Sequence, residues 1–165
     1  MKHGCQTGCR YQVILISLCT SYTVLQKMAE SIIIHFIELD PAVVVSRIDG
    51  MFGLRDHQTW SFPADDYLLR VSPYDDFESE YEASERDDIA SKLGGIPTVS
   101  FDFEIRRSRS DDACDVLERF VRVDLQGLNF VVDDMWRLIS SSDLQGVTDF
   151  LDCYRYKRMA EQAAP

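Results

Sequence analysis

The segment from Thr98 to Arg106 alternates between apolar and polar side chains, and this pattern constrains the fold more than any other in the chain. One set is Val99, Phe101, Phe103 and Ile105, and the other is Thr98, Ser100, Asp102, Glu104 and Arg106. A period of two places these sets on opposite faces of a β-strand, so one face is buried and the other meets solvent. Such strands are typical of antiparallel or mixed sheets, because parallel strands contain near-continuous apolar runs. The pattern therefore argues against a doubly wound parallel sheet.

The rest of the chain predicts strands that alternate with helices. Residues 31–39 form an almost continuous apolar run typical of a buried strand. Asp40 and Pro41 then supply an N-cap and a first helical residue. The further expected elements are an extended region over 59–72 broken at Pro63, a helix from Asp75 or Asp76 to Leu93, a helix from Ser110 or Asp111 to near Gly127, a strand over 128–132, and a last helix from Ser142 or Asp143 that ends with Arg155, Lys157 and Arg158.

This order predicts an α+β fold with a four-stranded mixed or antiparallel sheet and helices mostly on one face. We expect a ferredoxin-like core in which an acidic helix is added between the second and third strands. A flavodoxin-like α/β arrangement is the alternative. Residues 28–158 are expected to form one domain, preceded by an N-terminal extension over 1–27 and followed by a frayed tail over 159–165. Met28, which directly precedes the first strand, is an alternative start.

The cysteines and the absence of nucleotide motifs restrict the setting and the chemistry. The chain has five cysteines, an odd number without regular spacing, which argues against a disulfide framework. We therefore expect a reducing, cytoplasmic location. The apolar run over 13–18 is too short to cross a membrane. The glycines form neither a dinucleotide-binding nor a P-loop motif, so no cofactor is predicted.

Acidic residues are concentrated in one segment. Ten of them lie between Asp65 and Asp88, and Arg70 and Arg86 are the only basic residues there. On a continuous helix Glu78, Glu82 and Glu85 would share one face, where like charges repel each other by roughly a few tenths of a kcal/mol per pair. This segment is interpreted either as a surface for a cationic partner or as a solvated face that keeps the protein soluble.

The overall charge favours a basic protein as the partner. The chain has 28 acidic and 17 basic residues, a formal net charge of −11. Such a field repels nucleic acids and anionic membranes and speeds the encounter with basic proteins. Aromatic residues near the acidic segment can serve as apolar anchors. The predicted partner-binding residues are Asp75, Asp76, Glu78, Glu82, Glu85, Trp60 and Tyr74, with Trp136 as a further exposed anchor.

Two other functions are compatible with the sequence. Asp102, Glu104 and Arg106 resemble the strand motif of metal-dependent nucleases, although that motif usually has a lysine in the last position. Together with Asp133 and Asp134, these carboxylates could bind a hard cation, which makes a metal-dependent hydrolase the first alternative. The second alternative is a homo-oligomeric structural module.

A further indication comes from a resemblance to a known class of proteins. The segments Leu93–Pro97, Phe101–Arg107 and Val131–Asp134 resemble bacterial immunity proteins of toxin–antitoxin and polymorphic toxin systems. This resemblance implies a non-enzymatic inhibitor that blocks the active site of a cognate toxin, often a basic nuclease. It transfers no functional residue to this chain, because no motif matches position by position.

Overall fold

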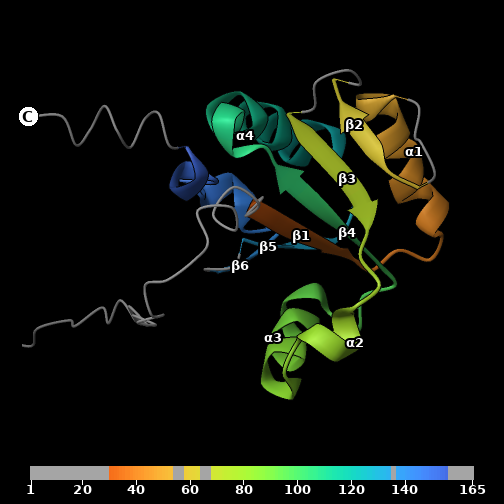
Figure 1. Ribbon diagram of the computed structural model, residues 1–165. Helices are drawn as coiled ribbons and strands as arrows, with labels where there is room; N and C mark the ends of the chain where they lie inside the picture. The colour runs from red at the N-terminus through yellow and green to blue at the C-terminus, as the bar shows by residue number, and fades with distance from the viewer. Residues whose placement is uncertain (1–29, 54–57, 64–67, 135–136, 156–165) are drawn as a thin grey trace, which may run out of the picture.

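The computed structural model describes residues 30–53, 58–63, 68–134 and 137–155. These residues form an α+β fold with one six-stranded sheet, in which every neighbouring pair of strands is antiparallel (Figure 1). The strand order is β2-β3-β4-β1-β5-β6. The strands are β1 (Glu30–Phe36), β2 (Trp60–Phe62), β3 (Leu69–Pro73), β4 (Val99–Ile105), β5 (Phe130–Asp133) and β6 (Leu138–Ser140).

The two strands with the strongest sequence signals, β1 and β4, lie next to each other in the middle of the sheet. Ile34 pairs with Phe101 and Ile32 pairs with Phe103, so their apolar side chains lie on one face. All four of these side chains are buried in the core. The apolar period of two predicted over 98–106 is confirmed, and it places the main core on this face of the sheet.

Helices α1 (Pro41–Phe52) and α4 (Ser110–Arg119) cover this core face (Figure 1). The start predicted for α1 is confirmed, because the Asp40 side chain accepts a hydrogen bond of 3.0 Å from the Ala42 N–H. Val44, Ile48 and Phe52 recur every four residues along α1 and are buried, as their spacing predicts. The apolar stripe of α4 likewise packs on the sheet through Ala113 and Leu117.

The opposite face of the sheet is partly covered by α2 (Phe77–Glu80) and α3 (Ala83–Leu93), which Figure 1 shows on the other side of the strands from α1 and α4. Helix α3 packs against β5 and β6. The expectation of helices mostly on one face is therefore wrong. The polar face of β4 is also less exposed to solvent than its sequence indicates, because Ser100 is only 6% exposed. The chain between β3 and β4 folds back over this face and covers it.

The sheet is larger than the four strands predicted. The extended region broken at Pro63 forms two strands, β2 and β3, and β6 was not expected at all. The flavodoxin-like alternative is wrong, because that arrangement requires parallel strands and this sheet is antiparallel throughout. The predicted extension over 1–27 and tail over 159–165 lie outside the described residues.

The last predicted helix is absent from the described part of the chain. Short 3₁₀ turns at Leu144–Gly146 and Asp152–Tyr154 occupy its place. The Arg122 guanidinium donates hydrogen bonds of 2.7 Å each to the carbonyl oxygens of Leu144 and Val147. Since a side chain from another element satisfies these carbonyls, the segment gains less from forming a helix of its own.

Arg155, expected in the exposed last turn of that helix, is instead 1% exposed. Its guanidinium forms ion pairs with Asp115 and with Glu118, the latter at 2.8 Å. A fully buried arginine needs such partners, because an unpaired buried charge is costly. Arg155 therefore fastens the end of the described chain to α4. Lys157 and Arg158 lie outside the described residues.

Candidate functional site

The chain between β3 and β4 carries a continuous set of exposed carboxylates, which we call the acidic surface. Its members lie on α2, on α3 and in the short segments that precede these helices. They are Asp75, Asp76, Glu78, Glu80, Glu82, Glu85, Asp87 and Asp88, all of them exposed. Asp65 and Asp66, which the sequence analysis counted with this segment, lie outside the described residues.

The predicted helix from Asp75 or Asp76 to Leu93 is interrupted at Tyr81 and Glu82. Glu82 has extended backbone dihedrals and is the N-cap of α3. Its side chain accepts from the backbone of Glu85, while the Glu85 carboxylate accepts a hydrogen bond of 2.8 Å from the Glu82 N–H. This capping box satisfies backbone donors that the first turn would otherwise leave without partners.

The expectation that Glu78, Glu82 and Glu85 share one helix face is therefore wrong. Glu78 belongs to α2, whereas Glu82 and Glu85 form the start of α3. On a continuous helix the like charges of these three residues would repel each other. Here the reciprocal hydrogen bonds between Glu82 and Glu85 cap the start of a separate helix. Glu82 and Glu85 consequently have a structural role in addition to their charge.

Arg86 is the basic residue within this surface, and it is turned toward the protein. Its Nη1 donates hydrogen bonds to the carbonyl oxygens of Glu78 at 3.0 Å and Tyr81 at 2.6 Å. Its Nε lies 3.7 Å from the Glu78 carboxylate. Arg86 thus connects α2 to α3, and its guanidinium is directed toward these partners rather than toward solvent.

A buried polar network lies beneath the acidic surface. The Tyr81 hydroxyl donates a hydrogen bond of 2.6 Å to Asp133, and His35 Nε2 lies 3.3 Å from the same hydroxyl. His35 Nδ1 lies 2.8 Å from Ser100 Oγ. Because the Tyr81 proton goes to Asp133, His35 Nε2 is the donor to Tyr81, and Nδ1 accepts from Ser100. Tyr81, at the junction of α2 and α3, is joined in this way to residues of the three strands β1, β4 and β5.

Aromatic rings surround His35 and attach α2 to the sheet. The rings of Phe77 and Tyr81 lie 5.3 and 5.5 Å from the His35 ring, and Tyr74 lies at 6.3 Å, all in edge-on arrangements. Burial lowers the pKa of His35 to about 4, so the imidazole is neutral near pH 7. Burial and the bond to Asp133 raise the pKa of Tyr81, which keeps its hydroxyl protonated.

Both ring nitrogens of His35 have partners, so this buried histidine is satisfied within the core. The sequence did not predict the link from Tyr81 to Asp133, whose residues are 52 positions apart. No local pattern signals such a pair.

The three predicted aromatic anchors have different outcomes. Trp60 is 1% exposed and belongs to the core, so its prediction as an exposed anchor is wrong. Its indole N–H donates a hydrogen bond of 2.7 Å to Asp49 of α1, which gives a buried tryptophan the polar partner it requires. Tyr74 is half-buried, and its hydroxyl donates to Glu80 at 2.9 Å. Trp136 lies outside the described residues.

The carboxylates of the metal alternative are not brought together. Ile33 pairs with Asp102 on one side and Asp133 on the other, so the β1 strand separates these two residues. Asp134 is buried and accepts hydrogen bonds from Arg137, and Glu104 lies 3.6 Å from Arg70. In the described ranges, no three or more His, Cys, Asp or Glu side chains are arranged to hold a metal ion.

Comparisons of the chain with protein-family models, with curated proteins and with solved structures find no match. None of the helices in the described segments combines the length and the apolar character of a membrane span.

Proposed function

We propose that this chain is a protein-binding domain whose acidic surface enters a basic cleft of its partner. The observation that carries the proposal is the exposure of eight carboxylates over residues 75–88, while the one arginine among them faces the protein. Such a surface attracts a cationic protein over a distance and repels nucleic acid. The most specific form of the proposal is an immunity-type inhibitor, in which carboxylates take the place of phosphate groups in a basic toxin or nuclease.

The way the surface is attached to the molecule supports this proposal. Arg86, the capping box of α3 and the ring cluster around His35 hold α2 and α3 in place. A binding surface that is already ordered loses less conformational entropy when a partner binds. In the same proposal we interpret the arrangement β5-β1-β4-β3, with α1 and α4 on one face, as a ferredoxin-like core, to which α2 and α3 are added.

The proposal is tested by identifying a partner and measuring how salt affects the complex. The tagged protein is used as bait in its source cells, and a captured protein is purified and titrated against the bait at increasing salt concentration. We expect a basic partner whose affinity falls steeply with salt, because exposed charges are screened. A purified partner whose affinity does not change with salt would contradict the electrostatic mechanism.

A further inference from the structure

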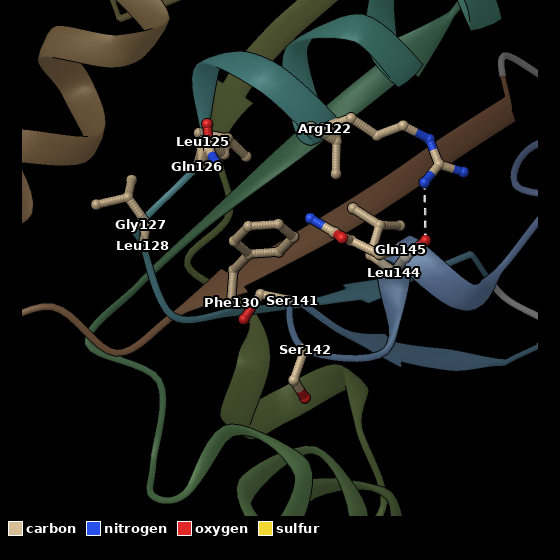
Figure 2. A pocket seen from close by; sticks show the side chains of 11 residues that line it. Arg122, Leu125, Gln126, Gly127, Leu128, Phe130, Ser141, Ser142, Leu144 and Gln145 are labelled. Atoms are coloured by element: carbon tan, nitrogen blue, oxygen red, sulfur yellow. Dashed lines mark hydrogen bonds between the residues drawn. The ribbon is translucent and has the colours of Figure 1, made fainter.

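A pocket of about 510 Å³ lies at one end of the core face and shares no lining residue with the acidic surface (Figure 2). Its size falls within the range of roughly 300–1,000 Å³ that is usual for small-molecule sites. Its walls come from the loop over 125–128, from Phe130 at the start of β5, and from the turn over 141–145 that follows β6. The pocket forms where short turns, instead of the expected helix, cover the sheet.

The helical layer is distorted where it meets this pocket. After α4 the chain continues as a π-helix, η2 (Phe120–Asp124), in which the Leu125 N–H donates a hydrogen bond of 3.0 Å to the Phe120 carbonyl. Turns of this kind are rare in proteins, and those that occur often lie at functional sites. Gly127, with a φ of +86°, then reverses the chain toward β5. The π-helix contributes Val121 and Arg122 to the pocket lining, and the left-handed Gly127 lies in the same wall.

The opposite wall is fixed by Arg122, whose charge is fully engaged. Its Nη atoms donate to the Leu144 and Val147 carbonyls, and its Nε lies 3.0 Å from the Glu118 carboxylate. Figure 2 shows the guanidinium directed toward the Leu144 carbonyl and away from the pocket centre. Among the described residues the lining contains neither Asp nor Glu, although the chain carries 28 acidic residues. The described lining of the pocket thus presents neither an unpaired positive charge nor an unpaired negative charge.

The remaining lining groups are apolar at the floor and neutral at the rim. Phe130, Leu125 and Leu144 form the floor, while the exposed Gln126 and Gln145 belong to the rim. The Gln145 amide is directed toward the Phe130 ring in Figure 2. A carboxamide provides both hydrogen-bond donors and an acceptor. We propose that this pocket binds an uncharged planar heterocycle, whose ring packs on the apolar floor and whose edge hydrogen-bonds to Gln126 and Gln145.

The test uses small probes that differ in charge. Nicotinamide and adenine are the neutral planar probes, nicotinate is the anionic probe and benzamidine is the cationic probe. Each is titrated into the full chain while backbone amide resonances are followed by NMR. We expect a neutral probe to shift the resonances of residues 125–128 and 141–145, and both charged probes to bind at least about tenfold more weakly, because the pocket has no free charge to compensate theirs.

Variants at the rim test the assigned hydrogen bonds. Both glutamines are exposed, so the double variant Gln126→Ala, Gln145→Ala is expected to fold. Loss of two hydrogen bonds should weaken the neutral probe about tenfold. Ser91→Ala, an exposed position on α3, is the control and should bind as the native chain does. The proposal is overturned if neither neutral probe shifts these resonances, if a charged probe binds as tightly, or if the double variant retains native affinity.

Discussion

At the scale of single residues, the link between the sheet and the acidic surface depends on His35. This side chain is fully buried, contacts Ser100 and Tyr81 through its two nitrogens, and lies among three aromatic rings. An imidazole in this position is stable only when it is neutral. Protonation would place a charge on a fully buried side chain, although the Asp133 carboxylate lies one hydroxyl away.

The burial of His35 predicts a specific pH dependence of stability. Its pKa is lowered from 6.5 to about 4, so the unfolded chain binds the proton more readily than the folded chain. The contribution of His35 to the free energy of unfolding is therefore complete above pH 6.5 and is lost as the pH falls toward 4. We expect this loss to be on the order of 3 kcal/mol.

The check compares urea unfolding of the native chain and of the His35→Asn variant across this pH range. The variant lacks the contacts of the imidazole at every pH, so the informative quantity is the slope of stability against pH. The native chain should show the steeper decrease. Equal slopes in the two proteins would mean that His35 is protonated as easily in the folded state as in the unfolded one.

The Tyr81 hydroxyl is expected to stabilise the fold by about 1–3 kcal/mol, because it joins the Asp133 carboxylate to the buried His35. Tyr81→Phe tests this value in chemical denaturation. Tyr74→Phe is the matched control, since the Tyr74 hydroxyl donates to the exposed Glu80, which water can solvate. If the two variants lose the same stability, the buried network does not have the role assigned to it.

At the scale of elements, local sequence signals determine some parts of the fold and distant contacts determine others. The β1 strand and α1 helix were predictable because an apolar run, an N-cap and a four-residue spacing each act within a few residues. Trp60 was misplaced because its ring packs against Phe101 and its N–H bonds to Asp49, both of which belong to other elements. The last helix was predicted wrongly because Arg122 acts on carbonyls 22 and 25 residues away.

In the acidic surface, too, one feature was predictable from the local sequence and another was not. The exposure of its carboxylates followed from their density in the sequence, but the break at Glu82 did not. A Ser, Thr, Asp or Asn is the usual sign of a helix start, and Glu82 is none of these. Its capping role becomes visible only through the reciprocal bond with Glu85.

The capping box predicts that Glu82→Ala destabilises the start of α3 by about 1 kcal/mol. Faster hydrogen exchange of the backbone amides of Arg86 and its neighbours would report this loss. Asp87→Ala removes the same charge from an exposed position within α3 and is the control. Exchange rates that rise equally in both variants would show that charge, rather than capping, accounts for the effect.

Arg122 is expected to determine the conformation of the chain after β6. Arg122→Met should destabilise the protein by about 2 kcal/mol, because it removes two charged hydrogen bonds to carbonyl groups. Hydrogen exchange should increase over residues 144–154. Arg119→Met, at an exposed position of α4, is the matched control and should leave exchange in that region unchanged. Unaltered exchange in the Arg122 variant would exclude this role.

At the scale of the whole molecule, the two faces of the sheet differ in what they carry. The core face, with α1 and α4, contains most of the buried apolar side chains. The other face carries α2 and α3, which present the acidic surface and rest on a small polar and aromatic network. We therefore expect changes in the exposed carboxylates outside the capping box of α3 to alter partner binding while the fold retains its stability.

The most direct test of the proposed function compares two triple variants at the same positions. Asp75, Asp76 and Glu78 are exposed and lie outside the capping box of α3. One variant removes their charge with Asp75→Asn, Asp76→Asn and Glu78→Gln, and the other retains it with Asp75→Glu, Asp76→Glu and Glu78→Asp. Calorimetric titration with the purified basic partner is expected to show at least about tenfold weaker binding for the neutral variant alone. Equal affinities of the two variants would contradict an acidic protein-binding surface.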